Sequence, residues 1–361
     1  MSMLNLKPRA VWAPLLLLVG TTVSEGAWSE HHQACDPVAD MIFVCGPQNA
    51  EDLVRVEGTP WIIASGMSGE GISGHMYLLD PAKRSYEDLY PADWPVHRWD
   101  RDEFAECPGE LNTADFSAHG LAIRALGDGK HRLYVTSHGA REAVEIFEVD
   151  ARGEKPGVAW VGCVVMPEHA SINSVAALAD GGFITTRIMS EGPEPSADIF
   201  AGEITGFLYE WHPGGVLTAL ANTEMSGPNG IEVSPDGSTV FVASWGRGEL
   251  SRFERTGEGG LSHNATVSMN FRVDNLRWST RGTLLAVGHR LSDTQDCGGP
   301  LCIDEWEVAE VDPETMTART LVVKPSMNGF TGATVAIEAE DGLWLGTFDG
   351  DRIVFIPQPT R

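Results

Sequence analysis

The feature that most constrains this chain is a pair of apolar runs that recurs six times along its 361 residues. In each copy a polar residue opens a short apolar run, and a Gly-rich turn then leads into a second run. HGLAIR from His119 with GDGKHRLYVTSH from Gly127 is one such pair, and PNGIEV from Pro228 with PDGSTVFVASW from Pro235 is another. One such sheet cannot bury both of its faces, whereas a ring of stacked sheets can. The pattern therefore predicts an all-β fold, a six-bladed β-propeller.

The propeller should include most of the chain. A closed ring of sheets routinely reaches this length as one domain, so we expect residues 28–361 to form a single propeller. MIFVC from Met41 is expected to close the ring by pairing with the last blade. The long connection that begins at Met189 leaves the same end of blade three at which Asn173 lies. Connections of that length are either lids or surface excursions, and both alternatives stay open here.

Residues 1–27 have the pattern of an export signal. Lys7 and Arg9 precede an apolar stretch from Ala10 to Val23, and small residues follow up to Ala27. The stretch is too short to span a bilayer, which favours a cleaved signal peptide over the alternative of an uncleaved N-terminal anchor. We therefore expect a secreted or periplasmic protein that meets a membrane only if this segment is retained.

Cysteine usage and net charge agree with export. All six cysteines follow the N-terminal segment, and an even number in an exported chain predicts disulfides. Cys35 with Cys45, and Cys297 with Cys302, have the spacing of local loop clips. The formal net charge of −26 argues against nucleic acid or an anionic membrane surface as a partner.

Oxygen-bearing side chains stand at the openings of the first runs. Because the innermost strand of each blade lines a shared channel, these side chains should meet at one mouth of that channel. They are Glu51, Asn173, Asn229, Asp274 and Asn275. Two carboxylates with three amides form the all-oxygen set that Ca²⁺ prefers, whereas Zn²⁺ favours His or Cys and Mg²⁺ a tighter octahedron. Each residue alone is also a common turn residue, and only the set indicates a calcium site.

Two histidines should reach the same mouth. His119 opens blade two, and His138 ends the hairpin that returns beside it. An imidazole pKa of about 6.5 suits a general base near neutral pH. The residues that end the second runs of the other blades should form the walls of the mouth, and they are Met67, Arg187, Trp245, His289 and Phe348. The sequence contains no GxSxG elbow, so a covalent nucleophile has little support.

These motifs, taken in this order, resemble those of the paraoxonase family of calcium-dependent lactonases and arylesterases, which are six-bladed propellers. The resemblance covers roughly residues 45–358. It rests on EDL at Glu51, HGL at His119, VTSHGAREAVEIF around His138, IN at Asn173, PNGIEVSPDG at Asn229, VDN at Asp274 and GATVA near the end. It implies that the five oxygen-bearing residues hold a catalytic calcium and that His119 and His138 form a base dyad.

Two elements of that family are incomplete here. The resemblance implies a second, buried calcium held by Asp52, by the backbone carbonyl of Leu121 and by an acid after Asn173. Ser174 occupies the last position, which leaves this ligand set incomplete. The family's disulfide between the two chain ends also lacks a partner, because no cysteine follows Cys302. Ring closure should therefore depend on strand pairing or on another bridge.

The expected activity is that of a carboxylic ester hydrolase acting on lactones or aryl esters. Ca²⁺ would polarise the carbonyl group, and His119, oriented by His138, would activate water. The apolar walls Met67, Trp245 and Phe348 are consistent with a hydrophobic acyl or aryl group. One alternative is a sugar lactonase resembling the senescence-marker and gluconolactonase family, which shares the propeller and a divalent ion. Another is a noncatalytic binding propeller in which calcium only stiffens the channel.

Overall fold

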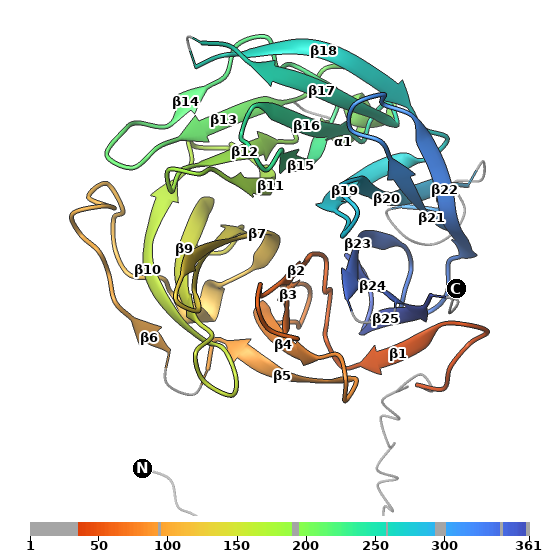
Figure 1. The fold of residues 1–361 in the computed structure, drawn as a ribbon, viewed down its shortest axis with the longest axis horizontal. Helices are drawn as coiled ribbons and strands as arrows, with labels where there is room; N and C mark the ends of the chain where they lie inside the picture. Colours follow the sequence, from red (N-terminus) through yellow and green to blue (C-terminus); the bar gives the residue numbers. More distant parts are fainter. Residues whose placement is uncertain are drawn as a thin grey trace, which may run out of the picture. The chain divides into compact units, whose positions relative to one another are not determined.

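The computed structural model describes residues 35–92, 95–189, 195–257, 259–292, 301–339 and 342–358. Within that part of the chain, six β-sheets stand around a common centre, which confirms the six-bladed β-propeller (Figure 1). The predicted export signal in residues 1–27 and the predicted partner Cys297 lie outside the described residues.

Each sheet is built on an antiparallel meander whose first strand is innermost. In blade two the short strand β6 adds parallel to the outer edge, and in blade six the outermost strand is β1 from the start of the described chain. Blades one and two contain β2 (Leu53–Arg55), β3 (Ile62–Gly66), β4 (His75–Asp80) and β5 (Ser85–Tyr90), and then β7 (Ala118–Gly127), β8 (Lys130–Ser137), β9 (Ala143–Asp150), β10 (Gly157–Val165) and β6 (Val96–His97). Blades three and four contain β11 (Ile172–Ala177), β12 (Phe183–Arg187), β13 (Phe207–Trp211) and β14 (Thr218–Ala219), and then β15 (Pro228–Val233), β16 (Thr239–Ser244), β17 (Glu249–Arg255) and β18 (Leu261–Ser268). Blades five and six contain β19 (Arg272–Trp278), β20 (Leu284–Leu291), β21 (Ile303–Val311) and β22 (Ala318–Pro325), and then β23 (Ala333–Ala339), β24 (Gly342–Thr347), β25 (Arg352–Pro357) and β1 (Ile42–Cys45).

The ring is closed by strand pairing between the two ends of the described chain. Strand β1 pairs antiparallel with β25 in blade six, with Phe43 opposite Val354. This pairing confirms the closure predicted from MIFVC. It also supplies the connection that the missing terminal disulfide would otherwise provide.

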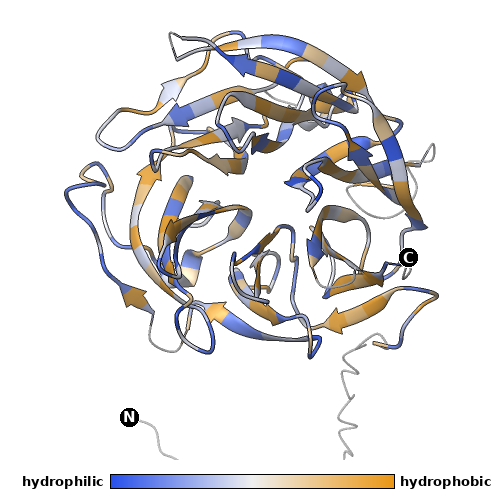
Figure 2. Cartoon of the chain, viewed as in Figure 1, coloured by the Kyte–Doolittle hydropathy of each residue, from blue (hydrophilic) through white to orange (hydrophobic). Residues whose placement is uncertain are grey.

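The hydrophobic core lies between neighbouring blades. Trp344 of blade six, for example, packs in one cluster with Ile62 and Ala64 of blade one, and all three side chains are buried. Figure 2 shows hydrophobic segments along the strands of each sheet. Burying both faces of every sheet in this way is what makes a closed ring favourable for such short strands.

The inner hairpins of five blades share one irregularity. The pairing of the first strand with the second skips one or two residues close to the start of the first strand. The skipped positions are 119–120, 173–174, 229–230, 274–275 and 334. A β-bulge of this kind leaves residues outside the ladder and turns their side chains in a new direction. Four of these five bulges contain predicted site residues.

Two glycines in these bulges allow neighbouring inner strands to approach closely. A Cβ atom at Gly120 would lie 2.5 Å from the carbonyl oxygen of Asn173, and one at Gly230 would lie 2.4 Å from that of Asp274. Such distances are too short for any side chain. The glycines of the HGL and PNG motifs therefore bring the site-bearing strands of adjacent blades together.

The described chain contains few helices. They are η1 (Thr113–Asp115), a turn of 3₁₀-helix before blade two, and α1 (Pro195–Phe200), which lies in the long connection of blade three. None of the described helices is long and apolar enough to cross a membrane.

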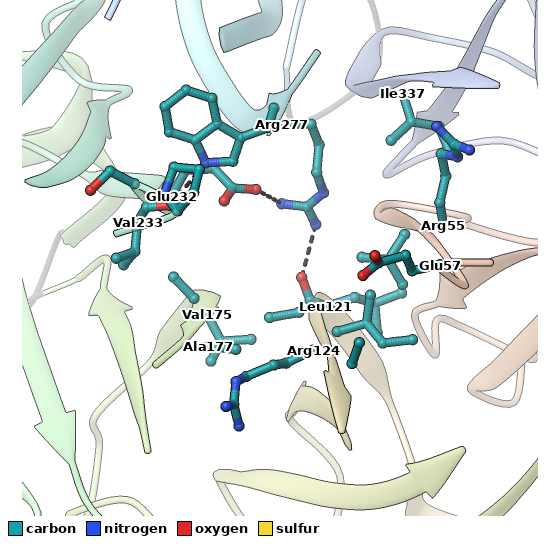
Figure 3. Close-up of a pocket in the computed structure, with 18 of the residues that line it drawn as sticks. Arg55, Glu57, Leu121, Arg124, Val175, Ala177, Glu232, Val233, Arg277 and Ile337 are labelled. Atoms are coloured by element: carbon teal, nitrogen blue, oxygen red, sulfur yellow. Dashed lines mark hydrogen bonds and ion pairs between the residues drawn. The ribbon is translucent and has the colours of Figure 1, made fainter. Parts of the chain in front are cut away.

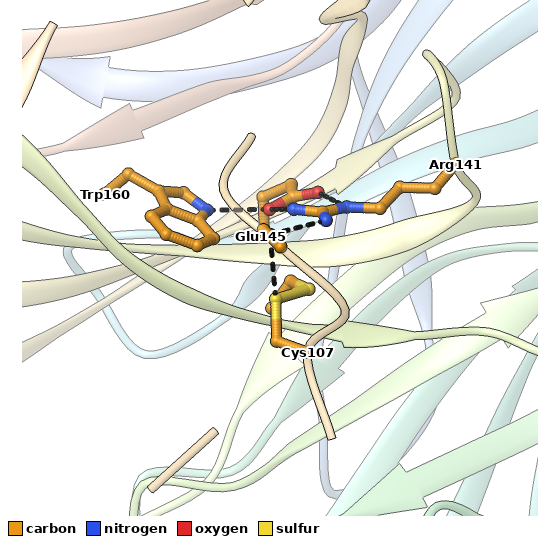
Figure 4. Close-up of a disulfide and its surroundings, with 6 residues drawn as sticks. Cys107, Arg141, Glu145 and Trp160 are labelled. Carbon is orange, nitrogen blue, oxygen red and sulfur yellow. Dashed lines mark hydrogen bonds and ion pairs between the residues drawn. A yellow bond between two sulfur atoms is a disulfide. The ribbon is translucent and has the colours of Figure 1, made fainter. Parts of the chain in front are cut away.

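Two disulfides lie within the described residues. Cys35 and Cys45 are bonded, as their spacing predicts, and the bond closes a loop of sequence separation 10. Cys107 and Cys163 form the second bond, with a separation of 56, which ties the segment before blade two to β10. Figure 4 shows this bond beside Arg141, Glu145 and Trp160.

Removing the second disulfide should destabilise the fold. Replacing Cys107 and Cys163 by Ala should lower the free energy of unfolding by about 2–4 kcal/mol, because the bond closes a long loop in the unfolded chain. Urea unfolding followed by tryptophan fluorescence measures this loss. The matched control replaces Cys35 and Cys45, which close a much shorter loop and should cost less. An equal or larger loss in the control would contradict the prediction.

Candidate active site and metal centre

A cavity of about 350 Å³ opens at one mouth of the channel and receives side chains from all six blades. Its lining is formed by Glu51, Met67, His119, Asn173, Ile188, Ser196, Ile199, Phe200, Asn229, Trp245, Asp274, His289, Leu301 and Phe348. The structure thus brings together four of the five predicted oxygen ligands, and Asn275 lies beside them through its contact with Glu51. Strand-opening residues gather here because all inner strands start at this mouth.

Four of the predicted wall residues line this cavity, and one does not. The four are Met67, Trp245, His289 and Phe348. Arg187 is absent from the lining, and its guanidinium lies over the ring of Phe207 at 5.3 Å from the ring centroid. The next residue, Ile188, takes the wall position in blade three. Successive residues of an extended chain point to opposite sides, so an error of one position changes which side chain faces the cavity.

Two of the amide side chains use their NH₂ groups within the cluster. The amide nitrogen of Asn275 donates to Glu51 Oε1 at 2.6 Å. The amide nitrogen of Asn173 lies 3.5 Å from His119 Nε2. The oxygen atoms of both amides, and Glu51 Oε2, are buried without a hydrogen-bond partner. Buried oxygens without a donor are costly, so this arrangement favours a cation among them.

Asn229 and Asp274 repeat this arrangement on the other side of the cluster. The two side chains form a hydrogen bond with each other, and Asn229 Oδ1 is buried without a partner. Burial raises the pKa of Asp274 well above its usual range, and the charge on Glu51 raises it further. Two buried carboxylates that repel each other in this way are an unfavourable pair unless a positive charge joins them.

The donor set fits a hard divalent cation. Two carboxylates and three amides from blades one, three, four and five line the cavity or contact its lining, and oxygen atoms of this kind are the ligands that Ca²⁺ prefers. Among the described residues, no group of three or more His, Cys, Asp or Glu is arranged to hold a metal. The amide oxygens therefore distinguish this candidate centre from the nitrogen- and sulfur-rich sites that zinc prefers.

His289 forms part of the cavity wall as a neutral imidazole. Burial lowers its pKa to about 4. Its Nδ1 atom lies 3.7 Å from Asp274 Oδ2, and its ring meets that of Phe348 edge-on with centroids 5.6 Å apart. Because it is uncharged at neutral pH, His289 adds no positive charge to the two carboxylates.

The two predicted histidines are in direct contact. His119 Nδ1 lies 2.6 Å from His138 Nε2, and His119 Nε2 lies 3.6 Å from Glu51 Oε2. Burial alone would lower the pKa of His119, but the charge of Glu51, and the hydrogen bond that the protonated imidazolium donates to it, raise that pKa above its ordinary value. His119 therefore directs one nitrogen at its partner and the other at the oxygen cluster.

A third residue, Glu142, completes the chain of contacts. Its two carboxylate oxygens lie 3.0 and 3.1 Å from His138 Nδ1. A carboxylate only accepts hydrogen bonds, so His138 carries its proton on Nδ1 and accepts at Nε2 from His119. His119 consequently carries its proton on Nδ1 and keeps a lone pair on Nε2. The contacts thus prepare Nε2 of His119 to accept a proton.

Glu142 was not predicted as a site residue from the sequence. Its contacts explain how it is held beside His138. It lies four residues after His138, in the turn between β8 and β9, and its Oε1 also accepts from the backbone nitrogen of Ile172 at 2.6 Å. Ile172 directly precedes the candidate ligand Asn173. The only sequence signal was an acid at that spacing in HGARE, which is common in surface turns.

A buried ion pair between Arg141 and Glu145 supports the turn that carries Glu142 (Figure 4). Glu145 is fully buried, and Arg141 donates to its two oxygens at 2.6 and 2.9 Å. Trp160 donates to the same carboxylate at 2.7 Å, and Arg141 also donates to the carbonyl of Gly109 at 2.8 Å. These contacts hold the turn against the segment that the Cys107–Cys163 bond ties down.

The predicted ligands of the second calcium are engaged by an arginine. Nη2 of Arg277 donates to the carboxylate of Asp52 and, at 2.8 Å, to the carbonyl oxygen of Leu121. Asp52 Oδ2 also accepts from the backbone nitrogen of Leu121 at 2.6 Å. A guanidinium group thus lies where the resemblance places a metal ion, and sequence reasoning did not single out this arginine.

The long connection of blade three contributes to the cavity wall. Ser196, Ile199 and Phe200 of α1 line the cavity, and the ring of Phe200 meets that of Trp245 edge-on with centroids 5.4 Å apart. Residues 190–194 of the predicted lid lie outside the described residues. The described part of this connection covers one side of the mouth.

Several solved structures share this fold. A gluconolactonase candidate superposes with a TM-score of 0.56 at 14% identity, over 90% of this chain and 94% of that one. A luciferin-regenerating enzyme gives 0.52 at 11% identity over 87% and 93%, and a streptogramin B lyase gives 0.50 at 12% identity over 87% and 96%. At such identities the likeness extends to the fold alone. No curated protein matches the chain significantly in sequence.

A family model bears on the two resemblances considered above. It does not support the paraoxonase assignment, which stays unconfirmed, and it agrees with the alternative of the senescence-marker and gluconolactonase type. Residues 74–283, more than half of the sequence, match the region described as SMP-30/Gluconolactonase/LRE-like, and the chain belongs to that family.

Proposed function

We propose that this protein is a metal-dependent lactonase whose substrate enters the cavity at the channel mouth. The observation that carries the proposal is the set of buried, unpartnered oxygens of Glu51, Asn173, Asn229 and Asn275 beside His119 Nε2. Membership of a family whose description includes gluconolactonase supports lactone hydrolysis as the reaction class. A site that combines a cation cradle with a general base suits hydrolysis of a lactone or an activated ester.

The candidate ligands would hold a divalent cation, for which Ca²⁺ is the best match in hardness and coordination. When bound, such an ion polarises a carbonyl group and stabilises the negative charge that develops on its oxygen. The chain's own part is to hold Glu51 and Asp274 as charged ligands and to keep the three amide oxygens directed at one point.

The histidines and Glu142 would supply the base. Nε2 of His119 accepts a proton from the attacking water, and His138 accepts a hydrogen bond from Nδ1 of His119. Glu142 holds His138 in the required tautomer and stabilises the positive charge that reaches the pair when the proton is taken up. His119 touches the reacting atoms, whereas His138 and Glu142 act through it as positioning residues.

The walls favour an apolar substrate. Phe200, Trp245 and Phe348, together with Met67 and Leu301, surround the space above the oxygen cluster. A hydroxyl group buried against such side chains without a partner costs about 1–3 kcal/mol. We therefore propose that the substrate is a lactone with a hydrocarbon substituent, with aryl esters as further substrates.

A second candidate, a sugar lactonase, is favoured by the family match rather than by the cavity. The two candidates differ in the substrate, because a sugar lactone carries hydroxyl groups that need polar partners in the cavity, whereas an alkyl lactone does not. Of the described cavity residues outside the oxygen cluster and His119, only Ser196, Trp245 and His289 carry polar side-chain nitrogen or oxygen atoms. A substrate panel separates the two candidates directly.

The test is a panel of alkyl-substituted lactones, an unsubstituted lactone, gluconolactone and phenyl acetate, assayed after chelation and after return of calcium. We expect the alkyl lactones to give the highest kcat/KM, and we expect chelation to abolish hydrolysis reversibly. A preference for gluconolactone would support the sugar lactonase. Hydrolysis that persists after chelation would exclude the metal-dependent mechanism.

Replacing Glu142 by Gln should lower kcat by about 10–100-fold with little change in KM. A Gln amide can donate as well as accept, so His138 would no longer be held in one tautomer. The acid limb of the pH–rate profile should also move, because the charge that favours the imidazolium is lost. Glu142→Asp should restore part of the activity. A loss confined to protein stability, with an unchanged pH profile, would contradict the positioning role.

We further propose that the protein works outside the cytoplasm, secreted or in a periplasm. The disulfides Cys35–Cys45 and Cys107–Cys163 support an oxidising compartment. The strongly acidic composition agrees with a small-molecule substrate and no nucleic acid partner.

A further inference from the structure

The guanidinium group of Arg277 is enclosed by oxygen atoms below the candidate metal centre. The side chain is only 8% exposed. Its Nη2 atom donates to Asp52 and to the carbonyl of Leu121 at 2.8 Å, and its Nε donates to the carbonyl of Leu53 at 3.0 Å. Two segments, one from blade one and one from blade two, therefore direct three oxygen atoms at one side of the group.

The other side of the guanidinium is also bound by oxygen. Nη1 lies 3.3 Å from Glu232 Oε1 and 2.8 Å from the carbonyl of Leu276. Figure 3 shows Arg277 between Glu232 and Leu121, with a dashed line to each. Together with Asp52, the surroundings amount to two carboxylates and three backbone carbonyls. That is the donor chemistry of a calcium site, occupied here by a side chain.

We infer that Arg277 is a resident cation, which fills an oxygen-lined site that would otherwise take a divalent metal ion. Asp52 is fully buried and directly follows Glu51, so two adjacent carboxylates need positive charge on both sides. At the channel mouth, according to the proposed function, an exchangeable metal ion supplies positive charge to Glu51. On the opposite side, Arg277 supplies positive charge to Asp52 permanently, as part of the chain.

The position of Arg277 couples this charge to the candidate site. It lies two residues after Asn275 in β19, and it contacts Asp52 of blade one and Leu121 of blade two, which is two residues after His119. The group therefore ties together the segments that carry a ligand from blade one, a ligand from blade five and the proposed base. We expect it to keep the oxygen cluster assembled when no metal is bound.

The site is reachable from the far end of the channel. A second cavity, of about 560 Å³, is lined by later residues of all six inner strands, including Arg277 and Glu232 (Figure 3). An ion could enter from this side if the guanidinium were absent. Shortening the side chain should therefore convert the guanidinium site into a metal site.

The experiment compares wild type, Arg277→Ser and Arg277→Lys by metal stoichiometry, using calcium and the luminescent probe terbium, and by thermal unfolding in calcium or chelator. Arg277→Ser should bind one more ion than wild type. Its melting temperature in chelator should fall by at least about 5 °C and should recover with calcium. Arg277→Lys keeps a positive charge and should gain no ion. The double variant Asp52→Asn with Arg277→Ser is the matched control and should also gain none.

Each outcome decides the inference. A folded Arg277→Ser protein with the wild-type number of ions would overturn it, and so would a gain of an ion in Arg277→Lys. If Arg277→Ser does not accumulate folded, refolding from urea with and without calcium replaces the titration, and failure in both conditions overturns the inference. Failure of the proposed function is distinguishable, because wild type would then bind no ion or hydrolyse no lactone, while Arg277→Ser would still bind one ion more than wild type.

Discussion

Replacing His119 by Gln should lower kcat/KM for the best lactone by about 10²–10⁴-fold while metal affinity stays close to that of wild type. Gln is similar in size and can keep a contact with His138, but it cannot take up a proton. The oxygen cluster should be retained, because no proposed ligand atom is removed. Steady-state kinetics, with calcium affinity measured by calorimetry on the same preparation, check the two parts of this result together.

The matched control for this variant is His263→Gln, which changes an exposed histidine on β18, away from the channel. Its activity should equal that of wild type. If His119→Gln hydrolyses lactones at the wild-type rate, another group is the base. If neither wild type nor variant hydrolyses any lactone or ester while both bind calcium, the alternative of a noncatalytic binding propeller is correct.

Replacing Asp274 by Asn should weaken calcium binding by more than about 100-fold and reduce lactonase activity in proportion. The substitution keeps the size of the side chain and removes one of the two negative charges that would attract the ion. In the metal-free protein the same change relieves repulsion between two buried carboxylates, so stability in chelator should rise slightly. In calcium the order should reverse, and wild type should melt at the higher temperature.

Calcium titration and thermal unfolding in chelator and in calcium measure these opposite effects. Asp304→Asn, which neutralises an exposed carboxylate, is the control and should change neither quantity. A drop in stability of Asp274→Asn in both conditions would indicate that Asp274 serves packing or hydrogen bonding rather than ion binding. That result would contradict the metal centre even if activity were lost.

Much of the fold and part of the site follow from the repeat, because a repeat places equivalent residues in equivalent environments. Once HGL, IN, PNG and VDN are aligned as strand openings, His119, Asn173, Asn229 and Asp274 must face one channel mouth. The pairing of Met41–Cys45 with the last blade follows in the same way, since a ring of this kind needs one strand from the opposite chain end.

The missed residues depend on contacts between segments whose relation the repeat does not encode. Glu142 lies in a turn whose conformation depends on Arg141, Glu145 and the Cys107–Cys163 bond. In the motif VDNLRW, Arg277 has the position of an ordinary polar residue in an alternating strand. Only the fold shows that three other blades surround it with oxygen atoms. Whether Ile188 or Arg187 faces the cavity depends on where β12 ends. An error of one residue in that position exchanges the two side chains.

The bulges at the openings of the inner strands separate folding from chemistry within each blade. The ladder hydrogen bonds of β11, β15 and β19 are made by residues on either side of Asn173, Asn229 and Asp274. A change of side chain at one of these three positions therefore leaves the pairing of its strand intact. The residues at the mouth of this propeller can therefore be substituted one at a time during evolution. Binding of new ions or substrates does not require a new fold.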